Sequence, residues 1–126
     1  MHMKQLCLVT MATCVALAAT NLAAQSNSFD GLYKPRGADY ANWDCRTVGQ
    51  DSGAIEIQNY EIWGVESLCR LNNPIPVNGM SAVLFDAECA GEGYEWTERV
   101  MLMSADFGVY HITDSFVAEW QNCAIR

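Results

Sequence analysis

The sequence has little positive charge, with 7 lysines and arginines against 15 acidic residues and a formal net charge of −8. Nucleic-acid binding needs clustered basic side chains to neutralise phosphates, and no such cluster occurs. We therefore expect no nucleic-acid partner. An acidic chain attracts cationic molecules instead, so the charge favours a cationic secreted protein as the partner.

Long apolar runs are also scarce, and the one present lies near the first residue. Lys4 precedes an apolar stretch over residues 6–19, and Leu22-Ala23-Ala24 precede a polar segment. This layout predicts a secretory signal peptide over residues 1–24, cleaved after Ala24. About 14 apolar residues are too few for a hydrocarbon core of about 30 Å, which disfavours a transmembrane anchor. We expect a periplasmic or secreted protein with no membrane span after cleavage.

Removal of this segment leaves residues 25–126, a length typical of one domain. Lys4 is the only charged residue lost, so the formal charge falls by one unit from −8 to −9. We expect a single disulfide-stabilised β domain that is monomeric.

The cysteines that remain show no close C-x-x-C pair, which disfavours a zinc site. An even number in an exported chain of this size predicts two disulfides. Three pairings are open, and we favour Cys45–Cys123 with Cys69–Cys89 because the first and last strands of a closed sheet are neighbours. Each bridge would destabilise the unfolded chain by roughly 3 to 4.5 kcal/mol.

Catalytic groups are few in residues 25–126. His111 is the only histidine there, which rules out a three-histidine metal site, and the disulfides leave no free thiol. No phosphate-binding glycine loop and no nucleophile elbow occurs. We interpret His111 as structural, with a pH-sensitive or catalytic role as the alternative. We expect no enzymatic activity, no cofactor and no metal.

Carboxylates are the remaining candidates for catalytic or metal-binding groups. Five of them lie close together in the sequence: Asp86, Glu88, Glu92, Glu95 and Glu98. A glycosidase pair or a calcium site would use such groups. However, alternation places Asp86 and Glu88 on the outer face, where acids ordinarily serve solubility. We interpret the set as a solvated face.

Apolar residues alternate with polar ones between Met80 and Met103, which predicts a β-hairpin centred on Cys89–Gly93. Both glycines of the joint are expected to supply positive φ. Further extended segments are expected over residues 29–33, 40–45, 54–58, 60–63, 107–113 and 116–123. Residues 66–71 fit a strand or a helical turn, and residues 72–79 are expected to form a loop.

Six to eight short strands without a helical pattern predict an all-β fold, a small antiparallel β-barrel or a sandwich, with two disulfides. Each of the four tryptophans falls in an expected strand, and core packing is the predicted role of most of them.

The tip of the central hairpin is the best candidate for a binding site. It carries one acid between two glycines and is flanked by two amphipathic rings, which is typical of a recognition loop on a rigid sheet. A plain turn anchored by Cys89 is the alternative. The candidate binding residues are Gly91, Glu92, Gly93, Tyr94 and Trp96.

The cysteine pattern, with the segments Glu66–Cys69 and Cys89–Gly93, resembles small exported four-cysteine proteins of proteobacteria. More distantly it is similar to periplasmic lysozyme inhibitors of the MliC type. Those are antiparallel barrels whose Ser-Gly-x-x-Tyr loop enters the lysozyme cleft. Here Gly91 and Tyr94 are in register with that loop, Ala90 replaces its serine, and Glu92 adds a negative charge.

These observations lead to an expected function with alternatives. The first is an exported, non-catalytic binding protein that inhibits a basic secreted hydrolase. The alternatives are a barrel that binds a small molecule or a lipid, and a structural periplasmic protein. A carboxylate enzyme is the weakest hypothesis, because the chain has no evident base, nucleophile or metal site.

Overall fold

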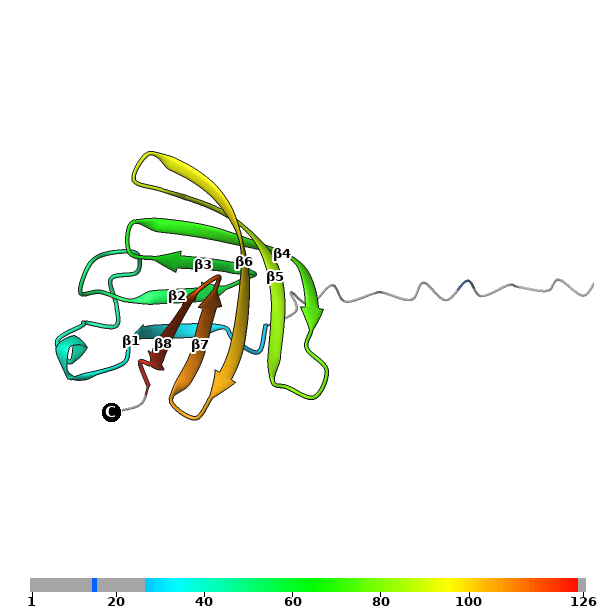
Figure 1. Ribbon diagram of the computed structural model, residues 1–126. Helices are drawn as coiled ribbons and strands as arrows, with labels where there is room; N and C mark the ends of the chain where they lie inside the picture. The colour runs from blue at the N-terminus through cyan, green and yellow to red at the C-terminus, as the bar shows by residue number, and fades with distance from the viewer. Residues whose placement is uncertain (1–14, 16–26, 125–126) are drawn as a thin grey trace, which may run out of the picture.

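The fold is a closed barrel of eight antiparallel strands (Figure 1). The computed structural model describes residue 15 and residues 27–124, so the expected signal peptide and its cleavage site lie outside the described residues apart from Val15. No helix within the described part has the length and apolarity to cross a membrane. The strands are β1 (Gly31–Pro35), β2 (Ile55–Gln58), β3 (Glu61–Gly64), β4 (Ser67–Pro76), β5 (Ala82–Gly91), β6 (Tyr94–Ala105), β7 (Gly108–Thr113) and β8 (Phe116–Asn122).

Each strand pairs with the next one along the chain, and β8 returns to pair with β1. Tyr33 of β1 lies opposite Asn122 of β8, and this pairing closes the sheet. The sequence left a barrel and a sandwich open; the structure is a barrel, at the upper end of the expected strand number.

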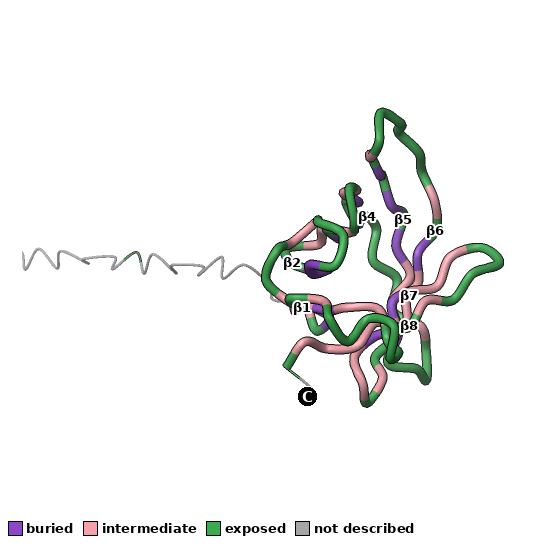
Figure 2. Tube along the Cα trace, turned by 90° about the vertical axis from the view of Figure 1, so that its left-hand side faces the viewer, coloured by how far each residue is buried: buried purple, intermediate pink, exposed green. Residues whose placement is uncertain are grey.

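The core lies inside the barrel, where buried side chains of β1 to β7 meet. Phe85 and Ala87 of β5 are 1% exposed, whereas Asp86 between them is exposed. This confirms the predicted alternation, and the buried stretches of β5 and β6 are seen in Figure 2. The fully buried large side chains are Phe85, Ile57, Leu102, Val100 and Val109.

Both expected disulfides are present. Cys69 and Cys89 lie directly opposite each other on β4 and β5. Cys45 lies in the long connection between β1 and β2, and its bond to Cys123 fixes that connection to the chain just after β8. The bridges therefore secure the β4–β5 pair and the connection that follows β1.

The expected extended segment over residues 40–45 is wrong. Residues Ala38–Tyr40 form one 3₁₀ turn, η1, which begins after Gly37 at φ 132°. Asp44 then accepts hydrogen bonds from the backbone N–H groups of Arg46 and Thr47, at 2.7 and 2.9 Å. An aspartate that binds the next backbone donors favours a turn over a strand.

The expected loop over residues 72–79 is also partly wrong, because β4 continues to Pro76. The pairing with β5 shifts between Asn72 and Ile75, and the shift leaves Asn73 and Pro74 without opposite residues. A proline cannot donate to the ladder, and a bulge is one of the few places where a strand tolerates it.

Candidate functional site

The tip of the β5–β6 hairpin rises beyond the rest of the barrel (Figure 1). The first four residues of β6, residues 94–97, are exposed on both faces of the strand, whereas Val100 and Leu102 further along are fully buried. The two strands nevertheless stay paired up to Gly91 and Tyr94. The candidate binding residues thus sit on a paired, projecting hairpin.

The turn at the tip consists of two residues, Glu92 at φ 49° and Gly93 at φ 81°. Positive φ at both positions is the geometry of the tight turns that fit the twist of paired strands. Gly93 therefore has the predicted role, but Gly91 does not. Gly91 is paired in β5, and a Cβ there would lie 2.6 Å from the backbone oxygen of Glu66. Gly91 is needed because two backbones approach closely.

This approach brings two acids together at neighbouring turns. Glu66 precedes Ser67, which lies opposite Gly91, so the Glu66 and Glu92 carboxyl groups meet across the ends of β4 and β5. A hydrogen bond with Glu92 and the negative charge of Glu92 raise the pKa of Glu66 above its usual range, and Asp51 adds to the effect. Within the described residues neither Glu66 nor Glu92 forms an ion pair. The tip is therefore a concentrated, uncompensated negative region.

Exposed aromatic rings lie beside these acids. Tyr94 is 75% exposed and Trp96 39% exposed. Trp63 on β3 is also exposed, and its indole N–H donates to Glu61 at 3.1 Å. The prediction of core packing holds for Trp120 and Trp43, which pack against the core, but it is wrong for Trp63 and Trp96. Trp43 also lies outside the strands.

The outer face of β4, β5 and β6 below the tip is hollowed and polar. Two open hollows of about 640 and 600 Å³ share Glu88 and Thr97. Arg70 lines the first hollow, and Arg99, which forms an ion pair with Asp86 at 3.4 Å, lines the second. This confirms that Asp86 and Glu88 face outward. In contrast with the tip, the charges here are mixed.

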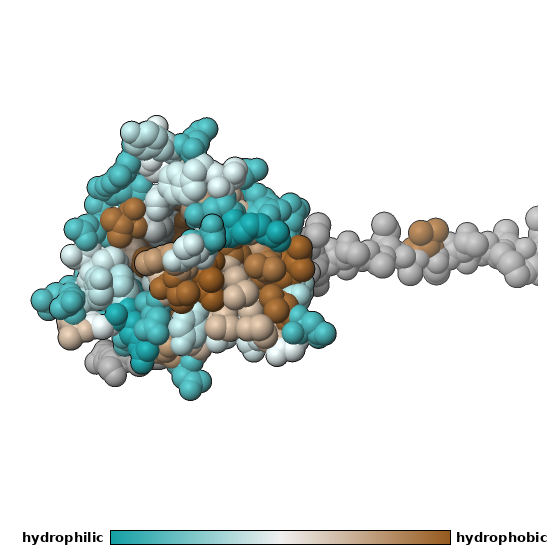
Figure 3. Space-filling view, in the orientation of Figure 1, coloured by the Kyte–Doolittle hydropathy of each residue, from teal (hydrophilic) through white to brown (hydrophobic). Residues whose placement is uncertain are grey.

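Further around the barrel the outer face carries an apolar row. Ile75, Leu84, Met101, Ile112 and Val117 lie opposite one another in turn from β4 to β8. Ile75 and Val117 at its ends are exposed, and apolar side chains gather on this side of the molecule in Figure 3. An exposed apolar area of this kind is a candidate contact surface.

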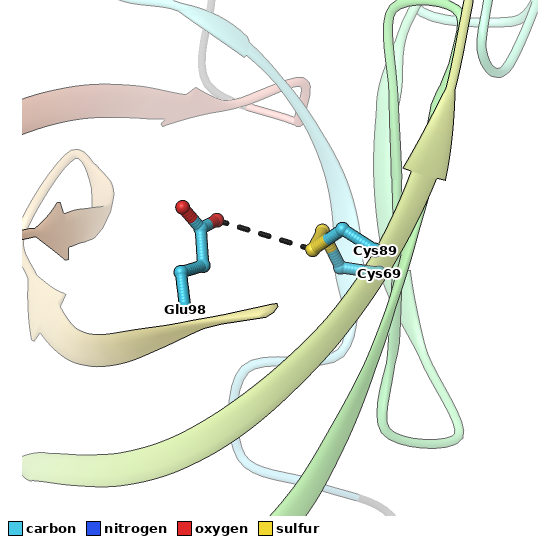
Figure 4. A group of neighbouring side chains, drawn as sticks. All are labelled: Cys69, Cys89 and Glu98. Atoms are coloured by element: carbon cyan, nitrogen blue, oxygen red, sulfur yellow. Dashed lines mark hydrogen bonds between the residues drawn. A yellow bond between two sulfur atoms is a disulfide. The ribbon is translucent and has the colours of Figure 1, made fainter. Parts of the chain in front are cut away.

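Glu98 is the one acid of the hairpin that faces inward. It lies between Trp96 and Val100 on the inward face of β6, and its carboxylate points toward the Cys69–Cys89 bridge (Figure 4). Oε1 of Glu98 lies 3.9 Å from Sγ of Cys89. These three residues are the only group of described side chains close enough together to hold a metal ion. In the disulfide the sulfurs are bonded to each other, so they are not thiolate ligands.

His111 also faces into the barrel, where its ring stacks on Trp120 with a centroid distance of 4.4 Å. Burial lowers the pKa of His111 to about 4, because the surroundings disfavour the charged form. The imidazole is therefore neutral at pH 7 and packs as a ring, in agreement with the structural interpretation.

Together these features define a closed, disulfide-linked antiparallel barrel with an acidic, aromatic projecting hairpin. No protein-family model, no curated protein and no solved structure matches the chain. The site is therefore interpreted from its own geometry.

Sequence reasoning missed Glu66 and Phe116, and it placed Glu98 wrongly on a solvated face. Glu66 gives no local signal, because its neighbour Glu92 is reached only through the pairing of β4 with β5. The solvated-face interpretation is wrong for Glu98, and the pattern itself indicates this, since Glu98 shares the even-numbered inward face of Trp96 and Val100. Phe116 could have been found in the same way from its spacing to Trp120 on β8.

Proposed function

We propose that this chain is an exported, non-catalytic binding protein that docks a basic secreted hydrolase and blocks it without turnover. The observation that carries the proposal is the meeting of Glu66, in the turn between β3 and β4, with Glu92 at the top of the β5–β6 hairpin. Two like charges held together raise the energy of the free protein, and a cationic partner would relieve that repulsion.

The shape of the tip supports docking. The β5–β6 hairpin is flanked by β4 up to its tip, where Ser67 lies opposite Gly91, so it can dock with little loss of freedom because its strands are already ordered. Tyr94, which directly follows the turn, is largely exposed and can bury a ring against the partner. The Gly91 and Tyr94 positions are those in which the sequence resembles the loop of MliC-type lysozyme inhibitors.

The chemistry of the tip fits binding better than catalysis. The two acids meet in full contact with solvent, and neither neighbours an imidazole or a thiol in the described part of the chain. The negative charge would speed association with a basic protein and make that association sensitive to salt.

The test is binding of the purified, oxidised protein to a panel of basic secreted hydrolases that includes lysozyme, measured by interferometry together with residual hydrolase activity. We expect one hydrolase to bind and lose activity, with affinity falling as salt is raised. Glu92→Gln should weaken that binding about tenfold, which corresponds to about 1.4 kcal/mol.

Asp106→Asn is the matched control, because it removes the same charge from the β6–β7 turn at the opposite end of the barrel. An equal loss in both variants would mean that net charge and not the tip is recognised. Binding of no cationic hydrolase in the panel would count against the proposal.

A further inference from the structure

At the end of the barrel that carries the projecting hairpin, aromatic side chains on the inward faces of β6 and β8 are exposed. Tyr94 and Trp96 share the inward face of β6 with buried Val100 and Leu102, yet both are exposed. On β8, Phe116 shares the face of Trp120, which packs against the core, and Phe116 is 63% exposed. Side chains that face inward and still contact solvent mark the mouth of a barrel.

One carboxylate lies within this mouth. Glu98 is half-buried on the same face, one inward position below Trp96. No lysine, arginine or histidine of the described residues forms an ion pair with it. Its polar neighbour is Sγ of Cys89 at 3.9 Å, and a disulfide sulfur has no proton to donate. The Glu98 carboxyl group therefore has no oppositely charged partner among the described residues.

The surrounding groups suit a cation. Aromatic rings present negative faces, and a cation placed over them is attracted by the ring quadrupole. The nearest histidine on the inner wall, His111, is neutral at pH 7 and does not repel positive charge. The strongly acidic chain also favours the approach of a cation.

We propose that the mouth of the barrel binds an organic cation, with Glu98 as its counter-ion and the rings of Trp96 and Phe116 as its walls. The site goes beyond the proposed docking of a hydrolase and does not require it. The same chemistry is offered by a free quaternary ammonium compound and by a basic side chain of a protein, and the experiment separates these sources.

The test is titration of the oxidised protein with choline and with its neutral isostere 3,3-dimethylbutan-1-ol, followed through the indole N–H signals in NMR spectra and through tryptophan fluorescence. We expect choline to saturate the Trp96 signal and to bind about tenfold more tightly than the neutral alcohol. Equal affinities, or no saturation by any cation used, would overturn the proposal.

Substitutions test the roles of Glu98 as the counter-ion and of Phe116 as an aromatic wall of the site. Glu98→Gln should weaken choline about tenfold without changing the neutral alcohol, whereas Glu95→Gln on the opposite face of the same strand should change neither. Phe116→Ala should weaken choline, and Val117→Ala on the outer face should not. Near-ultraviolet circular dichroism confirms that each variant is folded. A Glu98→Gln protein that binds choline like wild type would refute the assignment.

A further titration with the tripeptide Gly-Lys-Gly identifies the source of the cation. Competition with choline supports the site and assigns it to a basic side chain, whereas choline binding without competition supports it for a free quaternary ammonium. Glu92→Gln should leave choline binding unchanged. The proposal of a cation site at the mouth and the proposal of hydrolase docking at the tip can therefore be tested independently.

Discussion

The two halves of the β5–β6 hairpin have the same pairing but opposite surroundings. Along the lower half, Phe85, Val100 and Leu102 are almost completely buried, and the pair forms one wall of the core. Along the upper half, residues 94–97 are exposed on both faces. The Cys69–Cys89 bridge links β4 to β5 at the level where the two halves meet. Burial stabilises the lower half, whereas backbone pairing, the bridge and a tight turn maintain the upper half.

The largest expected loss of stability comes from a substitution in the lower half. Leu102→Ala removes a fully buried side chain and leaves a cavity, which should lower the free energy of unfolding by about 2 to 5 kcal/mol. Tyr94→Ala in the upper half should change it by less than about 0.5 kcal/mol, because that side chain is largely exposed. Urea unfolding of both variants measures the contrast, and similar losses would show that the tip packs like the core.

The bridge between the halves comes next. Replacing Cys69 and Cys89 together by serine should cost about 3 kcal/mol, because the bridge closes a loop with a sequence separation of 20. We expect the tip to lose order before the barrel does. Amide hydrogen exchange checks this: protection should fall first at Ala90 and Glu95, while Leu102 remains protected until global unfolding.

Acid should also lower the stability of the core beside the lower half, through His111, which lies on β7 opposite Leu102. Its folded pKa is lowered from 6.5 to about 4, so the stability it contributes is complete above about pH 6.5 and is lost as the pH falls toward 4. Between pH 7 and pH 5 the loss should be about 2 kcal/mol. Urea unfolding at several pH values measures this slope, and His111→Phe should flatten it. An unchanged slope in that variant would assign the acid sensitivity to other groups.

Two glycine substitutions sharpen the comparison within the tip. Gly91→Ala places a Cβ 2.6 Å from a backbone oxygen, so the neighbouring turns must separate, at a cost of about 1 to 3 kcal/mol. Gly93→Ala meets no atom within 4 Å and suffers only from its positive φ, at about 1 kcal/mol. Thermal unfolding ranks the two. A larger effect at Gly93 would contradict the close approach seen at Gly91.

The smallest effect is electrostatic and confined to the tip. The folded pKa of Glu66 is raised, so the folded protein binds a proton more readily than the unfolded chain, and stability falls as the pH rises through that pKa. Glu92→Gln should return the pKa of Glu66 toward its usual range and remove this slope. An NMR titration of the Glu66 carboxyl group measures the shift; an unchanged pKa in the variant would show that Glu92 is not its cause.

Features that depend on alternation and on cysteine spacing could be predicted from the sequence. Period-two patterning predicts the β class, the central hairpin and the outward position of Asp86. The even number of cysteines predicts two disulfides, and both are present. Prediction failed where local signals compete. Residues 40–45 resemble a strand in composition, but Asp44 binds the next backbone N–H groups and turns the chain. Pro74 suggested a loop, but a bulge accommodates it within β4.

The candidate site was harder to predict from the sequence than the fold. The exposed position of Trp96 depends on how far β6 extends beyond its neighbour β7, which pairs with β6 only from Met101 to Ala105. The meeting of Glu66 with Glu92 depends on the exact pairing of β4 and β5. Both are properties of register, and register is fixed by packing across the whole sheet.

The pairing of β1 with β8 has a consequence for how this barrel meets other molecules. Because β1 pairs with β8, the sheet has no free edge there, but β6 pairs with β7 only from Met101 to Ala105, so residues 94–100 of β6 are paired on the β5 side alone. The backbone groups of these residues that face away from β5 form a short free edge, and a free edge is where an incoming strand adds to a sheet.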